Sequence, residues 1–250
     1  MKLGLEGRVA LVTGGARDVG REIALGLAAE GAAVAVNYHG SEAAAEAVVA
    51  DIRGRGGKAI AIRCDIANHD AVRAMVAQTV NELGGLNILV NNAGLVFRKR
   101  FADTSPDEWR RQIDVCLYGT LNCCHAALPH LEAQPGTGRI LCVVGDSSRV
   151  GESGLAIAAA ARAGNIALLK SLARETRTGL TANTLSLGLI ETAHAPEFIA
   201  ANRDKLTKLY PLRRLGQATD VAPMAVLLAS DQGSWITGQV ISVSGGFSMV

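Results

Sequence analysis

The chain has 250 residues, of which 49% are hydrophobic and 19% are charged, and its formal net charge is +2. This length allows one large α/β domain or two small ones, and the nearly balanced charge argues against a dedicated nucleic-acid binder. Its apolar runs are too short to span a bilayer and no signal peptide precedes the first motif, so we expect a cytoplasmic protein without a membrane partner.

Predicted strands and helices alternate along the whole chain. Short apolar runs predict buried strands, and the segments between them have the apolar spacing of helices. The predicted strands cover 8–13, 33–38, 59–64, a run from 86, 138–144, 180–187 and a closing strand within 235–246. The predicted helices between them cover 20–30, 41–55, 70–83, 107–131, 155–175 and 219–229. No linker or repeat interrupts the series. This alternation predicts an α/β fold in a single domain, 1–250, with a Rossmann-type, doubly wound, parallel sheet of seven strands and helices on both faces.

A glycine-rich turn, Thr13-Gly-Gly-Ala-Arg-Asp-Val-Gly20, joins the first strand to the first helix. Such a turn directs backbone N–H groups and the positive end of the helix toward a phosphate group. Asp18 adds bulk and a negative charge inside it. Repulsion of a phosphate by this carboxylate would cost about 1–4 kcal/mol at about 4–5 Å, so we expect an impaired anion site.

The five cysteines lie at irregular spacing without a C-x-x-C pair, and no histidine completes a zinc set. We therefore predict free, buried thiols and no metal site.

Several motifs together resemble the short-chain dehydrogenase/reductase family. The glycine-rich turn is similar to the family's Thr-Gly-x-x-x-Gly-x-Gly fingerprint, with Asp18 in place of the middle glycine, and Asn91-Asn-Ala-Gly94 matches a family signature. This signature stabilises the sheet in the family as well as facing the cofactor. The resemblance assigns degenerate cofactor contacts to Gly14, Arg17, Asp18, Gly20, Asp65, Asn91 and Thr192.

The resemblance also bears on the cofactor and on the substrate end of the cleft. The second strand ends in Asn37-Tyr38-His39 and lacks the acidic residue that holds an NAD ribose, so with Arg17 nearby a residual preference would favour NADP. The segment 193–215 corresponds to the family's substrate lid. A basic loop over 98–100 is either a docking site for an anionic substrate, such as a coenzyme A ester, or a solvated loop.

The resemblance implies four catalytic positions, and this chain has lost the expected group at each. The family's tyrosine, lysine, serine and asparagine correspond here to Ala158, Arg162, Gly145 and Cys116. Arginine is not deprotonated in proteins, and a cysteine does not offer the donor and acceptor of an amide. A local bulge could bring Ser147 or Ser148 into the serine position. We therefore predict no catalytic residue in this chain.

These departures favour a pseudoenzyme subunit that stabilises or regulates a catalytically complete homologue. The resemblance implies that the helices over 107–131 and 155–175 and the C-terminal strand form the contacts of a heterodimer or heterotetramer. NAD(P) is expected in the partner subunit and not in this chain. By analogy the complex would resemble a heteromeric hydroxyacyl-CoA dehydrogenase, such as that of anaerobic toluene degradation.

Two alternatives remain at this point. One is a non-redox enzyme that uses Arg162, Asp146 and Ser147 or Ser148 as anion-binding and acid/base groups. The other is an oxidoreductase with an unusual proton relay.

Overall fold

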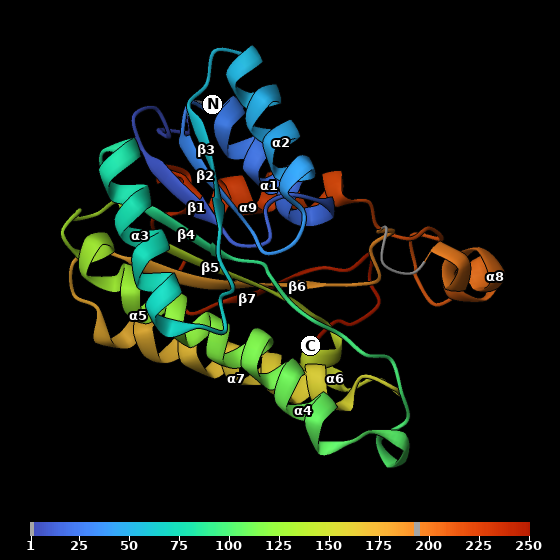
Figure 1. The fold of residues 1–250 in the computed structure, drawn as a ribbon. Helices are drawn as coiled ribbons and strands as arrows, with labels where there is room; N and C mark the ends of the chain where they lie inside the picture. Colours follow the sequence, from blue (N-terminus) through green and yellow to red (C-terminus); the bar gives the residue numbers. More distant parts are fainter. Residues whose placement is uncertain (1–2, 193–195) are drawn as a thin grey trace.

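A computed structural model describes residues 3–192 and 196–250. It contains a seven-stranded sheet between two layers of helices (Figure 1). The strands are β1 (Val9–Val12), β2 (Ala33–Tyr38), β3 (Ala59–Arg63), β4 (Ile88–Asn91), β5 (Arg139–Gly145), β6 (Thr181–Leu187) and β7 (Val240–Val243). The helices are α1 (Asp18–Ala29), α2 (Glu42–Gly54), α3 (His69–Leu83), α4 (Pro106–Ile113), α5 (Gly119–Glu132), α6 (Ser147–Val150), α7 (Ala156–Glu175), α8 (Pro196–Thr207) and α9 (Ala218–Ala229).

The sheet order is β3-β2-β1-β4-β5-β6-β7, and every described pairing is parallel. The predicted doubly wound, parallel, seven-stranded α/β fold is therefore confirmed. The order reverses between β1 and β4, which are neighbours in the sheet although two strand–helix units separate them in the sequence. In open parallel sheets a ligand cleft lies at this switch point, beyond the carboxyl ends of the strands.

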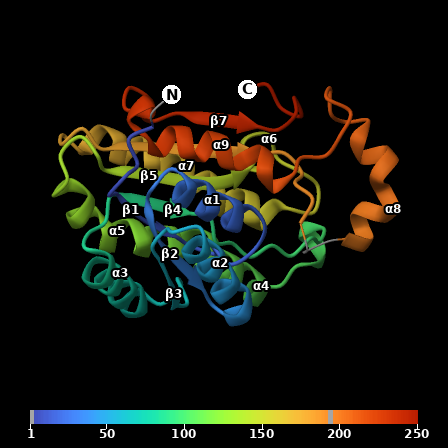
Figure 2. The same ribbon diagram turned by 90° about the horizontal axis from the view of Figure 1, so that it is seen from above.

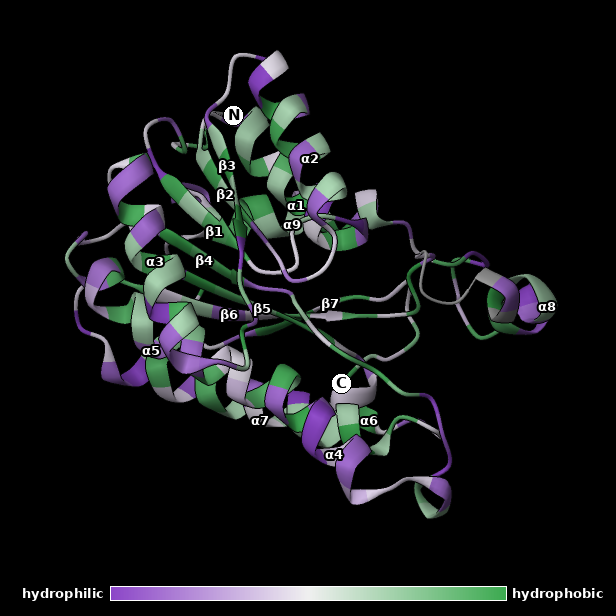
Figure 3. Ribbon diagram, in the orientation of Figure 1, coloured by the Kyte–Doolittle hydropathy of each residue, from purple (hydrophilic) through white to green (hydrophobic). Residues whose placement is uncertain are grey.

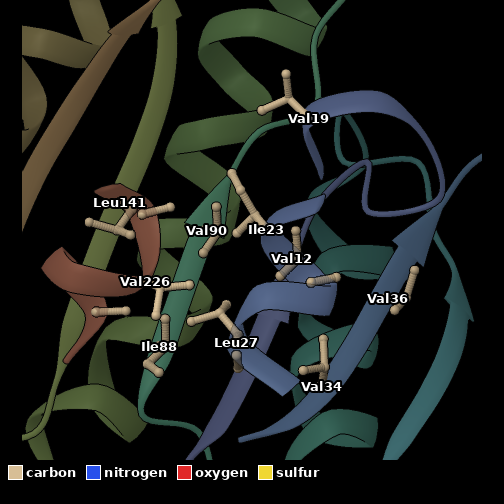
Figure 4. Packing of buried hydrophobic residues seen from close by; sticks show 14 of the residues in the cluster. Val12, Val19, Ile23, Leu27, Val34, Val36, Ile88, Val90, Leu141 and Val226 are labelled. Carbon is tan, nitrogen blue, oxygen red and sulfur yellow. The ribbon is translucent and has the colours of Figure 1, made fainter. Parts of the chain in front are cut away.

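Two hydrophobic clusters hold the layers together, one on each face of the sheet. The first joins the strands to α1, α2 and α9, and the second joins them to α3, α5 and α7. Figure 4 shows Ile23 and Leu27 of α1 against the strand residues Val12 and Val90, with Val226 of α9 beside them. Figure 3 shows the strands as the most hydrophobic layer and polar residues along the outer sides of the helices.

The predicted helix over 107–131 has a more detailed structure. A capping box starts α4: the Ser105 hydroxyl accepts from the backbone N–H of Glu108, and the Glu108 carboxylate accepts from the backbone N–H of Ser105. Between α4 and α5, residues Asp114–Tyr118 form a π-helical turn. Such turns widen a helix locally and are frequent at functional sites.

Helix α7 corresponds to the predicted apolar helix over 155–175. By length and composition alone it could cross a membrane, contrary to our expectation that no apolar run reaches that length. One such helix is weak evidence, because core helices of soluble proteins meet the same criterion. In this fold α7 packs against β5 and β6 as part of a helix layer.

The lid segment predicted over 193–215 is described from residue 196 onward, and 193–195 lie outside the described residues. It contains α8, which stands apart from the layered body (Figures 1 and 2). Ile199 of α8 forms a small separate hydrophobic cluster with Tyr210 and Leu215. The lid therefore contributes little to the main core.

Candidate functional site

The glycine-rich turn after β1 and the Asn-Asn-Ala-Gly segment after β4 meet at the switch point. The Asn92 side-chain amide donates to the backbone carbonyls of Thr13 and Gly14, at 3.0 and 3.2 Å. The Thr13 hydroxyl accepts from the backbone N–H groups of Asn92 and Ala93. These hydrogen bonds join the two segments at the switch point and give the signature the structural role that the resemblance implies.

Gly14 and Gly20 are both required by close backbone approaches in the turn. Gly14 has a positive φ of 61°, and a Cβ on Gly20 would lie 2.3 Å from the carbonyl oxygen of Gly14. The Asn37 side chain, buried at the end of β2, accepts from the Gly14 N–H and donates to the backbone carbonyls of residues 38, 62 and 64. The sequence did not lead us to predict this stabilising role of Asn37, because we considered the end of β2 only as a possible contact with the cofactor ribose.

Asp18, at the middle-glycine position, has a left-handed backbone conformation with φ of 49°. This explains physically why the family has glycine there, since L-residues other than Asn and Asp rarely adopt this conformation. Asp18 is also the first residue of α1. Its carboxylate therefore stands at the helix end where a phosphate would bind.

The other predicted cofactor contacts lie around the same edge. Arg17 is exposed and precedes α1, and Thr192 is half-buried at the end of the described segment after β6. Asp65 is exposed after β3, with Oδ1 accepting from the backbone N–H of Ala67 at 3.0 Å. Asn91, in contrast, is buried and donates to Cys124 Sγ, while its Oδ1 has no hydrogen-bond partner within the described part of the chain.

Cys116 lies in the π-helical turn and is only 2% exposed. Its Sγ donates to the Leu95 carbonyl at 3.2 Å and accepts from the Leu95 N–H at 3.4 Å. The thiol thus makes both contacts that we expected only an amide to make, although sulfur is a weak donor and acceptor. These two hydrogen bonds connect the π-helical turn to the segment after β4.

Gly145 ends β5 and carries no hydroxyl, and the Ser147 hydroxyl lies near it. A Cβ built on Gly145 would lie 3.2 Å from Ser147 Oγ, so a hydroxyl stands beside the position of the family's serine. The neighbouring Asp146 is 2% exposed and accepts from the Ser186 hydroxyl at 2.5 Å. Its Oδ2 has no partner among the described residues.

Ala158 and Arg162 lie one turn apart on α7. The Ala158 methyl group is 4% exposed and supplies no proton. Arg162 is half-buried, and its Nη1 donates to the Val143 carbonyl at 3.3 Å. A Cβ on Gly94 would lie 1.8 Å from Arg162 Nη2, so the guanidinium lies directly against the Gly94 backbone.

Few groups balance the positive charge of the Arg162 guanidinium. In residues 3–192 and 196–250 no carboxylate forms an ion pair with it, and its Nε is buried without a hydrogen-bond partner. Nearby, burial raises the pKa of the Cys142 thiol to about 12, although the Arg162 charge acts to lower it. No thiolate is therefore available there near neutral pH.

The basic loop over 98–100 is largely neutralised. Arg98 pairs with Glu152 at 2.7 Å and Lys99 with Glu108 at 2.6 Å. These ion pairs favour the solvated-loop interpretation over an anion-docking site. In the described part of the chain, no three His, Cys, Asp or Glu side chains gather in a way that could hold a metal ion.

Comparison with known proteins places the chain in a family. Residues 14–248 match the family described as enoyl-(acyl carrier protein) reductase. The chain is 41% identical over 241 residues to the 3-oxoacyl-(acyl-carrier-protein) reductase FabG of Staphylococcus aureus, covering 96% of this chain and 98% of that protein.

Two solved structures extend the likeness to three dimensions. A short chain dehydrogenase from Burkholderia cenocepacia in complex with NADP is 35% identical, with a TM-score of 0.91 and coverage of 97% of this chain and 98% of that one. A blue fluorescent protein from a metagenomic library in complex with NADPH is 31% identical, with a TM-score of 0.92 and coverage of 98% and 100%. With these matches over nearly its whole length, the chain belongs to the short-chain dehydrogenase/reductase family.

Proposed function

We propose that this chain is a non-catalytic subunit of a short-chain dehydrogenase/reductase hetero-oligomer, which stabilises or regulates a catalytically complete, NAD(P)-dependent partner. The observation that carries the proposal is the buried methyl group of Ala158 at the position of the family's acid/base. No proton donor or acceptor stands there for a substrate oxygen.

The magnitude of the loss supports this role. A positioned general acid/base contributes roughly 10²- to 10⁴-fold in rate, and a hydrogen-bond donor to a developing oxyanion about 10²- to 10³-fold. Ser147 can supply part of the second contribution, because its hydroxyl stands beside Gly145. It cannot supply the general acid/base contribution, since a serine hydroxyl is too weak an acid to exchange a proton near neutral pH, and arginine side chains do not act as acids or bases in proteins.

The substrate of the complex is proposed from the relatives. The Staphylococcus aureus protein is named a 3-oxoacyl reductase of an acyl carrier protein, whose substrate is an acyl thioester. We therefore assign the interconversion of a hydroxyacyl and an oxoacyl thioester to the partner subunit, with NADP(H) or NAD(H) bound there.

Two exposed apolar surfaces support a partner subunit. On one, α5 and α7 lie in the same helix layer (Figure 1), with Tyr118 beside them 54% exposed and the small residues Ala160 and Ala167 exposed on α7. On the other, Trp235 precedes the edge strand β7 and is 98% exposed. Exposed aromatic residues of this kind are typical anchors of protein interfaces.

A second candidate, a non-redox enzyme, rests on three side chains near the end of β5: Asp146 and Ser147 follow this strand, and Arg162 donates to the carbonyl of its residue Val143. A poorly compensated guanidinium, a hydroxyl and a buried carboxylate with a free Oδ2 could bind and activate an anionic substrate. This activity would need no nicotinamide cofactor. It would appear as turnover by the chain alone in assays that contain no NAD(P)H.

The test of the leading proposal is co-expression with a homologue that carries the complete Tyr-x-x-x-Lys motif. We expect a mixed oligomer that reduces an acetoacetyl thioester with NADPH or NADH, while the isolated chain shows no turnover. Replacing the partner's active-site tyrosine by phenylalanine should abolish all activity of the complex, whereas Ser147→Ala in this chain should not.

A further variant distinguishes a chain that lacks catalytic groups from an oxidoreductase with an unusual proton relay. Ala158→Tyr combined with Arg162→Lys should not make the isolated chain active, because Gly145, Cys116 and Asp18 remain. An isolated homo-oligomer of the unaltered chain that reduces the thioester at rates comparable to the family would overturn the proposal.

A further inference from the structure

Two exposed histidines lie side by side where α3 packs against α5 (Figure 1). His69 is the first residue of α3, and His125 lies in the middle of α5, far along the chain. Their ring centroids are 5.7 Å apart, and the planes of the rings are inclined by 42°. Neither residue belongs to the candidate cleft, so the function proposed above does not account for the pair.

Helix α5 is tied to the segment that leads into α3. The side-chain amide of Asn122 donates to the backbone carbonyls of Ile66 and Ala67, at 3.0 and 3.3 Å. A Cβ on Gly119 would lie 2.5 Å from Ile66 Cδ1, so the lack of a side chain there lets the two segments approach closely. His125 follows Asn122 by one helical turn and is its neighbour on the helix surface. The contacts that hold this segment therefore also bring His125 to the start of α3.

The start of α3 fixes the position of the other histidine. Asn68 caps the helix, with Oδ1 accepting from the backbone N–H of Ala71 at 3.0 Å, and His69 directly follows this cap. The Asp70 carboxylate lies 3.5 Å from His69 Nδ1. A carboxylate beside one ring nitrogen favours the proton on that nitrogen and leaves Nε2 as a ligand, an arrangement that recurs around protein-bound zinc.

Both rings are available to a ligand. Within the described residues neither imidazole makes a hydrogen bond, and the His69 side chain is 47% exposed. His125 is exposed as well. Neutral imidazole is the commonest metal ligand in proteins and suits zinc, copper, iron and nickel.

The spacing of the rings fits a tetrahedral ion better than an octahedral or square-planar one. A zinc–nitrogen bond of about 2.0–2.1 Å places each ring centroid about 3.2 Å from the metal. Two such centroids are then about 5.2 Å apart at the tetrahedral angle and about 4.5 Å apart at a right angle. The observed 5.7 Å is a small side-chain rotation away from the first value. The pair is therefore spaced for Zn²⁺ rather than for Ni²⁺ or Cu²⁺.

We propose that His69 and His125 bind Zn²⁺ at the surface of the chain, with water molecules in the remaining coordination positions. The described residues bring no third His, Cys, Asp or Glu ligand to this point, so the site is open and the ion is exchangeable. Our expectation of no metal site considered spacing along the sequence, which does not reveal two histidines that meet only in the fold. A bound ion joins α3 to α5, and α5 belongs to the surface proposed above for a partner subunit.

The test is isothermal titration of the untagged, metal-free chain with zinc chloride near neutral pH. We expect one zinc ion per chain, and His69→Ala or His125→Ala should each weaken its binding at least tenfold. Because both rings bind the same ion, the double variant should bind zinc only slightly more weakly than either single variant. His130→Ala is the matched control: it removes an imidazole from the last turn of the same helix and should change the affinity less than twofold.

Two results would overturn this zinc site. One is the absence of zinc binding to the unaltered chain at millimolar concentration. The other is zinc binding that either single variant weakens less than tenfold, which would place the ion on other side chains. Melting temperatures report whether the variants remain folded, and His69→Gln and His125→Gln replace the alanine variants if those do not fold. None of these outcomes bears on the proposed function, whose test is the turnover of a thioester.

Discussion

Replacing Asp18 by asparagine should weaken the fold slightly and strengthen nucleotide binding. Asparagine tolerates the left-handed conformation that Asp18 adopts, so this substitution removes the charge and keeps the backbone geometry. A carboxylate at a helix N-terminus stabilises a protein by about 0.3–1 kcal/mol, and Asp18→Asn should lose a stability increment of that size. Opposite signs for stability and affinity distinguish a charge effect from general damage.

The gain in affinity follows from the position of Asp18 at the start of α1. A unit charge about 5 Å from a phosphate charge is repelled by about 0.8 kcal/mol at the dielectric constant of water and about 3 kcal/mol at an effective value of 20. A suitable probe is 2′-phospho-ADP, which is the adenosine half of NADP with its phosphate groups. Since about 1.4 kcal/mol corresponds to a factor of ten, Asp18→Asn should tighten binding of this probe by roughly 4- to 150-fold at low salt. At about 1 M salt the screening length falls to about 3 Å and most of this gain should disappear.

The assay is titration of 2′-phospho-ADP at low and high salt, with urea unfolding of the same variants. Glu30→Gln is the matched control, because Glu30 is exposed at the far end of the same helix and loses the same charge. It should leave the affinity unchanged. An affinity gain below twofold for a folded Asp18→Asn variant at low salt, or a gain equal at both salt concentrations, would refute the electrostatic argument.

Three further predictions concern stability and thiol chemistry. Asn37→Asp would place a carboxylate against the three backbone carbonyls that the Asn37 amide now contacts. We therefore expect the unfolding free energy at pH 7, measured by urea titration, to fall by about 3 kcal/mol. A loss below about 1 kcal/mol would contradict the stabilising role of these hydrogen bonds. The Arg214 guanidinium holds the pKa of the Asp220 carboxyl at about 2, below its unfolded value, so the stability from this pair is present above the unfolded pKa and is lost as pH falls toward 2. Asp220→Asn should therefore lower the unfolding free energy by about 1 kcal/mol near neutral pH, a loss that includes the capping box of α9. The part of this loss that comes from the ion pair should shrink between pH 5 and pH 2. A difference in unfolding free energy that does not depend on pH would contradict the ion pair. Burial raises the pKa of the Cys64 thiol to about 11 and that of the Cys124 thiol to about 12. A thiol reagent at pH 8 should therefore label these two cysteines only after denaturation. Labelling of either cysteine within minutes in the native state would contradict its burial.

The elements that local sequence determines could be predicted well. The strand runs and the capping box at Ser105 and Glu108 depend on residues close together in the chain, and both are present in the structure. The π-helical turn at Asp114–Tyr118 could not be predicted, because it accompanies contacts between Cys116 and Leu95, which are 21 residues apart. Periodicity alone continues a helix through such a turn.

The candidate site was predictable only where a motif fixed the spacing. Counting back from Ala158 with the family's spacing located Gly145. The structure adds that Ser147 Oγ lies beside Gly145, which depends on how the chain turns after β5. The role of Asn37 had a sequence signal, a polar side chain within an apolar strand, that could have suggested a buried hydrogen-bonding role. The placement of the Arg162 guanidinium on Gly94 had none, because a long side chain can reach several positions.

The contacts of the remaining side chains separate those that hold the fold from those that face the cleft. Asn92 and Asn37 bond to the backbone of the turn, so the architecture alone accounts for them. Arg17 and Ser41, in contrast, make no cap bond to the helices that they precede, so capping does not account for them. The proposed non-catalytic role rests on a different pair, Ala158 and Arg162, because neither side chain offers an acid/base group to a substrate oxygen.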